Sequence, residues 1–467
     1  MPFLRTSLSR AISLGLVAAL LAGCATLPEP TPADTRAEAL GHVQVPQTWA
    51  VPVSAAPVDA GWLATFGDPQ LDALVREALA HSPDLAIAAA RVEQAAAQVD
   101  LANAQLKPAI GLLGRAGSRS VADLVSTLNG AMLRLTWEVD LWGRLRYQRN
   151  AAIAQRDASS ADFRAAQQSL AASVARAWFV ATETAQQVRI AQRMEADAQR
   201  LVGLSRDRLR VGAGTEIELM SARTNHASYR DALQQVELAH RSALRAVEIL
   251  VGHYPAAAIA PRTALAPFPG PAPAGMPLDA LDRRPDMVAA QRRVAAAFDL
   301  VGEAKASFWP SLSLSAGHGR VSRDAIEIQK SLDRTTSSAS ATATVPLYTG
   351  GRLTGNVRLR TAEQRAAVAN YAGLALRALN DVETALDAEA SLAAREALLR
   401  AAAEDSRRAA ALTEDAYRIG KSDLREVTDR QLSADAAEVA LLAVRRERLV
   451  RRVDLHLALG GDFIAGS

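Results

Sequence analysis

Residues Gly143–Gly212 read GRLRYQRNAAIAQRDASSADFRAAQQSLAASVARAWFVATETAQQVRIAQRMEADAQRLVGLSRDRLRVG. Between the terminal glycines, Arg144–Val211 contains no proline and one further glycine, Gly203. A single helix over this stretch, roughly 68 residues at ~1.5 Å each, spans about 100 Å. Helices of ordinary globular proteins run about 8–20 residues. The stretch therefore predicts an elongated structure built on very long helices.

The chain contains this pattern twice. Motifs of the first half recur 202 residues later up to Pro310, and 208 residues later from Gly351 onward. The recurring pairs are Pro83-Asp84 with Pro285-Asp286, Pro108 with Pro310, Gly143-Arg144-Leu145 with Gly351-Arg352-Leu353, Gly212 with Gly420, and Gly252 with Gly460. Constant spacing through both helical regions indicates an internal duplication. The extra residues of the second half fall between two predicted strands, where loop tips tolerate insertions.

Composition fits closely packed helices and gives no case for nucleic acid. Of the 467 residues, 49% are hydrophobic but only 4% are aromatic, so small side chains supply most of the apolar content. The formal net charge is +3. A near-neutral chain lacks the basic surface that nucleic-acid binding requires, and we expect no nucleic-acid partner.

The N-terminal residues 1–23 have the form of a signal peptide. Arg5 and Arg10 precede an apolar run over Ala11–Leu21, which is too short to span a membrane. The run ends in Leu21-Ala22-Gly23-Cys24, which resembles the bacterial lipobox, and Cys24 is the chain's one cysteine. The resemblance implies a covalent lipid on Cys24, and Ala25 implies sorting to the outer membrane. An ordinary signal peptide with an incidental cysteine is the alternative.

The predicted order of segments follows proline, glycine and periodicity. Residues 24–60 are rich in proline and alanine and are expected to be an extended tether. The remaining segments are the first repeat 61–252, with a β-hairpin at about 109–142, a long helix 144–211 and a helix 215–251; a proline-rich linker 253–280; the second repeat 281–460, with a helix 285–307, a β-hairpin at about 311–348, a long helix 352–419 and a helix 423–459; and a C-terminal tail 461–467.

The residues before Gly143 alternate with a period of two. Leu133, Leu135, Trp137 and Val139 fall on one face, and the charged or polar Arg134, Thr136 and Glu138 fall on the other. This alternation is typical of a barrel strand between lipid and water, and equally of a strand in a soluble antiparallel sheet. Residues 117–130 are expected to be a loop.

Two strands per half give four per chain, which is too few to close a membrane barrel, whose minimum is about eight. Open edges are not tolerated in lipid. The sheet is therefore either soluble or shared between chains.

Several motifs resemble the TolC-like outer-membrane efflux channels, in particular their OprM/NodT-type lipoprotein branch. The matching stretches are 61–71 (GWLATFGDPQL), 137–144 (WEVDLWGR), 283–286 (RRPD) and 346–352 (PLYTGGR). The resemblance implies a mainly α fold with a small antiparallel β part. It also implies a homotrimer whose 12-stranded outer-membrane β-barrel continues into a long periplasmic helical barrel of coiled-coil character. The chain is then the exit duct of a tripartite efflux pump in a Gram-negative bacterium. Its expected partners are a periplasmic membrane-fusion adaptor, an inner-membrane proton-driven (RND-type) pump and outer-membrane lipid.

The resemblance also implies the functional residues. The periplasmic gate is expected at Glu426, Asp429 and Tyr417, with the contact partner of Tyr417 left open. Glu426 and Asp429 are three apart and share one helix face, and three copies of them form carboxylate rings that favour cations. The alternative is a pair of ordinary exposed acids. The adaptor-docking turns are Arg210, Val211, Gly212 and Gly214 in the first half and Arg418, Ile419, Gly420 and Lys421 in the second. The strand–helix junctions are Gly143, Arg144, Gly351 and Arg352.

Other functions find less support in the sequence. The seven histidines are dispersed without metal-ligand spacing, and Gly212-Ala213-Gly214 and Gly350-Gly351 lack the lysine of a phosphate-binding loop. We therefore expect no enzymatic activity, no bound metal and no cofactor other than the covalent lipid. A duct for type I protein secretion is the closest alternative. A lipid-anchored periplasmic adaptor or scaffold is less favoured, because it has no use for the duplicated strand pairs.

Overall fold

The computed structural model describes residues 28–463 apart from residues 55, 57, 59, 116–117, 122–123 and 326–333. The predicted signal peptide and Cys24 lie outside the described residues. The described elements are α2 (Pro32–Leu40), a 3₁₀ helix η1 (Trp62–Phe66), α3 (Pro69–His81), α4 (Pro83–Gln105), β1 (Ala109–Arg115), β2 (Ser118–Val121), β3 (Leu124–Val139), α5 (Arg144–Arg210), α6 (Glu216–Val251), α7 (Pro277–Arg283), α8 (Pro285–Ala306), β4 (Ser311–Ala325), β5 (Arg334–Thr344), α9 (Arg352–Arg418) and α10 (Leu424–Ala458).

The chain forms two compact units, and each unit draws on both halves of the sequence. The first comprises the N-terminal segment up to Val43 with Ala90–Ala161 and Val288–Gly373. The second comprises Gln44–Ala89, Asp162–Met287 and the chain from Leu374 onward. The long helices α5 and α9 contribute to both units. The sequence repeat is therefore not a pair of separate bodies.

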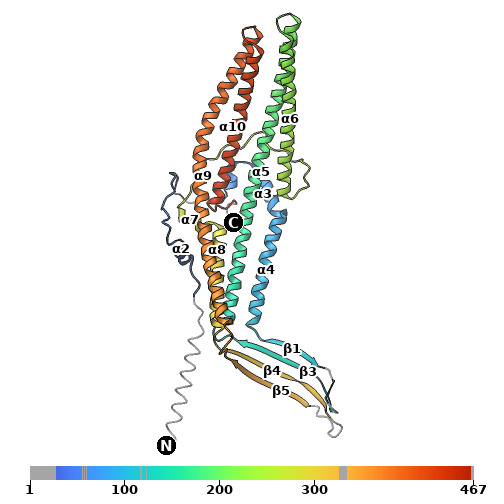
Figure 1. Cartoon of the computed structure of the whole chain (residues 1–467), viewed down its shortest axis with the longest axis vertical. Coiled ribbons are helices and arrows are strands. Elements are labelled where there is room, and N and C mark those ends of the chain that lie inside the picture. Colours follow the sequence, from blue (N-terminus) through green and yellow to red (C-terminus); the bar gives the residue numbers. More distant parts are fainter. Residues whose placement is uncertain are drawn as a thin grey trace. The chain divides into compact units, whose positions relative to one another are not determined.

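One antiparallel sheet in the first unit joins the strands of both halves. Its strand order is β1-β3-β4-β5, with the short β2 also paired to β3 (Figure 1). The longest pairing, β3 with β4, runs from Ser126↔Ala325 to Val139↔Leu312 and connects the two halves. Residues Leu124–Gly130 lie in β3, so the loop expected over 117–130 was wrong for this part. Cross-strand hydrogen bonding to β4 outweighs the polar, glycine-containing local sequence, because strand formation depends strongly on tertiary pairing.

The sheet has one apolar and one polar face. Leu133 pairs with Leu112, Leu135 with Ile110, and Trp137 with Leu314, so these side chains share a face. Ile110, Leu112 and Leu133 on this face are all more than half exposed. The opposite face carries Arg134, Thr136 and Glu138 together with Ser313 and Ser315 of β4. The alternation predicted from the sequence is thus present across several strands.

The N-terminal segment, expected to be an extended tether, contains a helix. The hydroxyl of Thr31 accepts the backbone N–H of Asp34, and the Asp34 carboxylate accepts the backbone N–H of Thr31. This capping box starts α2, which buries Thr35, Ala39 and Leu40. Burial of this face stabilises a helix that would be too short to persist alone.

The second unit has an aromatic core around α5. Trp178 and Phe179 of α5 pack with Trp62 and Phe66 of η1, and all four are buried. The indole N–H of Trp178 donates to the carboxylate of Asp68 at 2.9 Å. Asp68 also accepts two backbone N–H groups at the start of α3. One buried carboxylate thus fixes both the start of α3 and its position against α5.

The proline-rich linker is fixed to the second unit by charged side chains. The carboxylate of Glu248 accepts the backbone N–H groups of Ala257, Ala258 and Ile259, which lowers the pKa of Glu248 against the opposing effect of burial. The guanidinium groups of Arg448 and Arg452 lie over the ring of Phe268, at 3.8 and 4.6 Å from its centroid. The linker is therefore ordered by specific contacts in spite of its composition.

The ends of the long and medium helices repeat one geometry. Gly212, Gly252, Gly420 and Gly460 all have positive φ. After each of them the next residue donates its N–H five residues back, as Ala213 does to Arg208 and Lys421 does to Ala416, both at 2.8–2.9 Å. This is the Schellman arrangement, which favours glycine because only glycine adopts the left-handed conformation without strain. The duplication thus extends to the helix ends.

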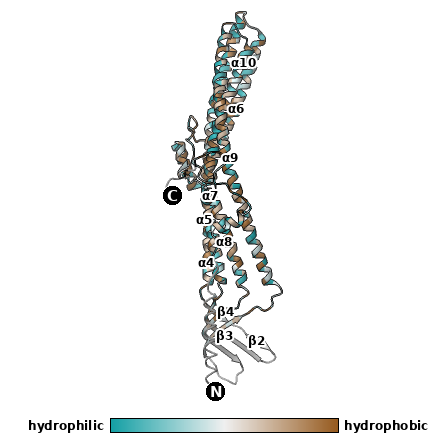
Figure 2. Ribbon diagram, turned by 90° about the vertical axis from the view of Figure 1, so that its left-hand side faces the viewer, coloured by the Kyte–Doolittle hydropathy of each residue, from teal (hydrophilic) through white to brown (hydrophobic). Residues whose placement is uncertain are grey.

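No helix in the described part of the chain is both long enough and apolar enough to cross a membrane. Figure 2 shows hydrophilic and hydrophobic residues mixed along α6 and α10.

Candidate functional sites

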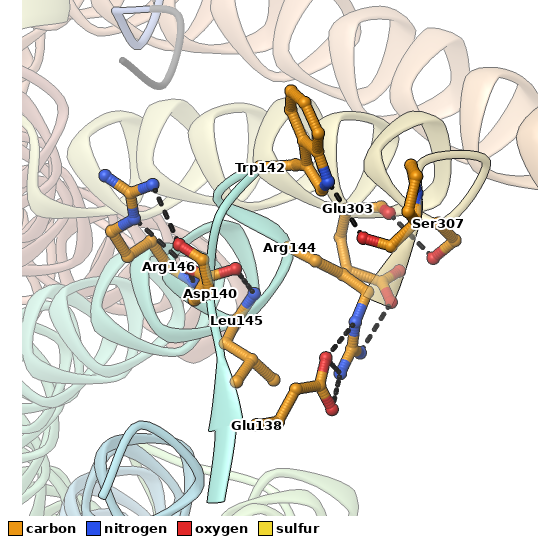
Figure 3. Close-up of polar contacts among 9 residues, drawn as sticks. Glu138, Asp140, Trp142, Arg144, Leu145, Arg146, Glu303 and Ser307 are labelled. Carbon is orange, nitrogen blue, oxygen red and sulfur yellow. Dashed lines mark hydrogen bonds and ion pairs between the residues drawn. The ribbon is translucent and has the colours of Figure 1, made fainter. Parts of the chain in front are cut away.

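The first candidate site is the junction between β3 and α5 in the first unit (Figure 3). Gly143 adopts a φ of 78°, which allows the chain to leave β3 and enter α5 within a few residues. The carboxylate of Asp140 accepts the backbone N–H groups of Leu145 and Arg146 at 3.1 and 3.0 Å. It therefore pairs two N–H groups of the first helical turn that have no partner within the helix. Its negative charge also interacts favourably with the positive end of the helix dipole.

Arg144 connects three elements at this junction. Its guanidinium donates to both carboxylate oxygens of Glu138 on β3, at 2.8 and 3.0 Å. It also lies 3.8 Å from the carboxylate of Glu303 on α8. A two-pronged arginine–carboxylate pair fixes orientation as well as distance. Arg144 therefore holds the end of β3 and the start of α5 against α8.

Two tryptophans complete this junction. The indole N–H of Trp142 donates to the carbonyl of Pro310 at 2.8 Å, and the ring of Trp142 stacks on Trp309 at 5.0 Å between centroids. The motif 137–144 thus joins the last residues of β3 to the residues just before β4.

The corresponding junction of the second half is built differently. Gly351 also has a positive φ, at 84°. At the spacing of the repeat, Glu138 corresponds to Pro346, Asp140 to Tyr348 and Trp142 to Gly350. Within the described part of the chain, Arg352 forms no ion pair like that of Arg144. The sequence singled out both junctions, but it is the first that carries the polar network.

The polar face of the sheet continues to the first junction. A cavity of about 770 Å³, open to one side, is lined by residues of both halves, of which Trp137 and Leu314 are apolar and most of the others are polar or charged. Among them are Lys107, Arg134, Glu138, Arg144 and Ser313. The polar and charged members of this lining suit water and solutes, and they come from the face of the sheet that carries Arg134, Thr136 and Glu138.

The second candidate site lies in the second unit, where the ends of four helices meet. We call it the tip cluster. It consists of the buried residues Leu201, Val202, Leu219, Ala222, Tyr417, Leu424 and Val427. The cluster joins the first helical hairpin, α5 with α6, to the second hairpin, α9 with α10. The two hairpins are therefore packed together just before their turns.

Arg208 is the contact partner of Tyr417. Its guanidinium carbon lies 4.5 Å from the centroid of the Tyr417 ring, a cation–π distance. The same guanidinium donates to the carbonyl of Tyr417 at 3.2 Å and to that of Ala213 at 3.0 Å. Both carbonyls belong to helix ends, where backbone acceptors lack helical partners. Arg208 thus ties the end of α9 to the turn of the first hairpin.

Sequence reasoning missed this role of Arg208, because arginines are frequent along α5. Tyr417 itself is fully buried, and its hydroxyl has no hydrogen-bond partner within the described residues. The contact with Arg208 therefore involves the ring and the backbone of Tyr417 and leaves its hydroxyl unused.

The predicted gate acids lie on the exposed side of α10. Glu426 and Asp429 are exposed, whereas Leu424 and Val427 between and beside them are buried in the tip cluster. The Glu426 carboxylate accepts the hydroxyl of Ser422 at 2.7 Å, and its backbone N–H is capped by Asp423 at 2.8 Å. The structure thus separates the two acids from Tyr417: the acids face outward and the tyrosine faces the cluster.

The predicted docking turns are exposed at their apolar residues. Val211 is 72% exposed and Ile419 is 67% exposed, at equivalent positions of the two turns. Arg210 pairs with Asp207 at 3.1 Å, and Arg418 pairs with Asp415 at 3.0 Å. The glycines Gly212 and Gly420 form the turns, as described above. Lys421 is exposed and follows the second turn.

Gly214 has a packing reason beyond turn geometry. A Cβ atom at this position would lie 3.0 Å from the Cβ of Arg208 and 3.2 Å from the carboxylate of Glu218. The absence of a side chain at Gly214 therefore lets Arg208 pass the turn and reach Tyr417.

Comparisons with known proteins agree with these features. The family model described as outer membrane efflux protein matches residues 74–253 and 276–461. The pyoverdine export outer membrane protein OpmQ of Pseudomonas putida is 32% identical over 440 residues, covering 90% of this chain and 93% of the relative. The probable efflux pump outer membrane protein TtgC of the same species is 28% identical, covering 97% of this chain and 95% of the relative.

Solved structures show the same fold. The structure of the outer-membrane channel OprN has a TM-score of 0.82 at 26% sequence identity, covering 90% of this chain and 98% of that one. The structure of CusC has a TM-score of 0.80 at 25% identity, covering 90% of this chain and 98% of that one. The resemblance read from the motifs is confirmed. With its two-faced sheet, its paired helical hairpins and these relatives, the chain belongs to the outer membrane efflux protein family, a family of outer-membrane channel proteins.

Proposed function

We propose that the chain is the outer-membrane exit duct of a tripartite efflux pump and passively conducts small molecules from the periplasm to the exterior. The observation that carries the proposal is the two-faced sheet, whose exposed apolar face fits lipid and whose polar face lines an open cavity. The names of the relatives support efflux over protein secretion, since OpmQ is named for pyoverdine export and TtgC for an efflux pump.

The proposed assembly is a homotrimer. β1 and β5 are the two edges of the long-stranded sheet, and each presents unpaired backbone groups. Such edges are costly in lipid unless another strand covers them. Pairing the β5 edge of one copy with the β1 edge of the next satisfies both. Three copies then close a 12-stranded β-barrel, which is above the minimum of about eight strands.

The gate is proposed at the helix ends. Contact between Arg208 and Tyr417 holds the two hairpins of one copy together, and three copies of Glu426 and Asp429 line the narrowed end. Their outward exposure leaves the carboxylates free to face an aqueous pore and to favour cations. Separation of the hairpins at the tip cluster widens the opening.

The partners are proposed from the turns and the anchor. The exposed Val211 and Ile419, flanked by Arg210, Arg418 and Lys421, offer an apolar contact with a basic rim to a periplasmic adaptor. That adaptor in turn connects the duct to a proton-driven inner-membrane pump. A lipid on Cys24 holds the N-terminal segment at the outer membrane.

Planar-bilayer recording tests this function. Purified trimers are expected to form conducting pores with weak solute selectivity. Folded trimers that insert but never conduct would exclude the duct. A deletion strain that loses export of small molecules, and regains it with the gene, would then support efflux. A strain that loses export of a protein instead would support secretion.

A further inference from the structure

In the first unit, α8 contains a carboxyl group that the duct function does not use. Asp299 has no exposed surface, and no cation or N–H group donates to its carboxylate oxygens within the described residues. An ionised carboxylate in such a position is strongly disfavoured, because nothing replaces the water that it loses. The group must therefore either carry a proton or acquire a partner.

The N-terminal segment that precedes α2 contacts the helix at the same place. The side-chain amide of Gln291, two turns before Asp299 on α8, donates to the carbonyl of Pro30 at 3.4 Å. Glu29, the residue before Pro30, is the charged neighbour that acts on Asp299. Two carboxyl groups that meet without a cation share a proton in preference to ionising together.

We propose that a proton shared between Glu29 and Asp299 holds the N-terminal segment on α8, and we call this shared-proton contact the clasp. Protonated Asp299 donates to the Glu29 carboxylate, and the segment from Glu29 through α2 remains in contact with α8. We call this the seated state. When Asp299 ionises, both the buried charge and the repulsion from Glu29 oppose the seated state. The segment follows Cys24 by five residues, so the clasp lies where the N-terminal anchor joins the body of the protein. It acts whether or not Cys24 carries lipid.

Three other titratable groups near this part of α8 have contacts of their own. Glu303, one turn beyond Asp299, faces Arg144 of α5. Tyr147 of α5 lies against Gly302, where a Cβ would come within 2.5 Å of its ring. On α2, Asp34 is engaged in the capping box. Among the described residues, Glu29 is thus the group whose charge opposes ionisation of Asp299.

The direction of the pH dependence follows from the burial. Burial, with the Glu29 charge second, raises the pKa of Asp299 to about 7. Release of the segment exposes Asp299 to water, where its pKa returns toward the ordinary value near 4. The seated state then holds one more proton than the released state between about pH 4 and 7. The equilibrium constant between the seated and the released state therefore falls by up to tenfold per pH unit across that window and levels off above it.

Hydrogen exchange of the full-length protein in detergent tests the clasp. Protection factors of amides in 28–40, corrected for the intrinsic pH dependence of exchange, are expected to fall as the pH rises from 5 to 7. The neutral variant Asp299→Asn should keep its protection across this range. Glu29→Gln should shift the fall to lower pH, because it removes the repulsive neighbour.

A matched control is Glu38→Gln, which changes an exposed acid on α2 and should follow the wild type. A wild-type profile that stays flat between pH 5 and 7 would overturn the proposal. So would an Asp299→Asn profile that falls as the wild type does. Recovery of protection at pH 8 on adding Mg²⁺ alone would replace the shared proton by a metal ion, and it too would overturn the clasp.

Discussion

The guanidinium of Arg208 lies over the ring of Tyr417, 4.5 Å from its centroid, and joins two hairpins that are more than two hundred residues apart in sequence. The contact uses the face of the ring and the carbonyl of Tyr417. It leaves the tyrosine hydroxyl buried and without a partner in the described structure. Substitution of Arg208 and removal of the Tyr417 hydroxyl should therefore have different outcomes.

Arg208→Ala should loosen the tip cluster, whereas Tyr417→Phe should not. The alanine variant loses a partly buried cation–π contact of about 1–2 kcal/mol and two helix-end hydrogen bonds. The phenylalanine variant keeps the ring and removes only an unsatisfied hydroxyl, which costs little. Single-channel recording should show more frequent opening for Arg208→Ala alone. Arg210→Ala, which removes a nearby exposed arginine, is the control and should gate normally.

Removing the charges of Glu426 and Asp429 should reduce cation selectivity. The double variant Glu426→Gln with Asp429→Asn keeps the size of both side chains and the fold of α10. In the trimer it removes six carboxylates from the narrow end. Reversal potentials in asymmetric salt should move toward zero. Glu404→Gln, an exposed acid of α9 outside the gate, should leave the reversal potential unchanged; an equal shift in both would remove the gate assignment.

Asp140→Ala should fray the start of α5. The carboxylate of Asp140 caps two backbone N–H groups, and loss of such a cap costs about 1–2 kcal/mol. Amides of the first turn of α5 should exchange faster. Tyr348→Ala changes the equivalent position of the second half, where the side chain is exposed, and should leave the first turn of α9 as it is.

His456 predicts acid sensitivity of the second unit. It is buried, stacks on Trp62 at 5.4 Å, and has no hydrogen-bond partner at either ring nitrogen among the described residues. Burial, with the nearby Arg452 second, lowers the pKa of His456 to about 3. The unfolded chain binds a proton below pH ~6.5 while the folded chain does not. The contribution of neutral His456 to the free energy of unfolding is therefore fully present above pH ~6.5. It falls by up to about 4 kcal/mol as the pH drops toward 3.

His456→Phe should abolish this component, since phenylalanine can stack on Trp62 without binding a proton. Denaturant midpoints at pH 7 and pH 4 measure it. The expected difference between the two pH values is smaller in the variant than in the wild type. Because Asp299 has the opposite dependence, the comparison is cleanest in an Asp299→Asn background.

Cys24→Ser should abolish incorporation of labelled palmitate. Lipid attachment at the lipobox begins with a thioether on the cysteine sulfur, which serine cannot form, and Cys24 is the only cysteine of the chain. The protein should still assemble, because the sheet itself offers an apolar face to lipid. Labelling that persists in the serine variant would place the lipid elsewhere.

The long helices could be read from the sequence because their signals are local. Absence of proline over Arg144–Val211, and glycine at Gly212 and Gly420, mark helices whose ends the structure places at Arg210 and Arg418. The alternation at Leu133 to Val139 likewise predicted the faces of β3. These features depend on neighbours in sequence, and a local pattern is sufficient to identify them.

The remaining features depend on residues far apart in sequence. Leu124–Gly130 is a strand because β4 pairs with it, and α2 is a helix because its inner face is buried. Arg208 meets Tyr417 across two hairpins, and no periodicity singles out one arginine of α5 for this contact. The buried Asp299 carries no signal at all, because an aspartate on a helix is ordinarily solvent-exposed.

The difference between the two strand–helix junctions has a mechanical consequence. Glu138, Asp140 and Arg144 stiffen the junction between β3 and α5. In the described part of the chain, Pro346, Tyr348 and Arg352 form no such polar contacts at the junction between β5 and α9. In the proposed trimer, stiff and compliant hinges alternate around the ring. A rotation of the helices about their axes is then accommodated at every second junction. α9 can therefore rotate relative to β5, while α5 keeps its orientation relative to β3.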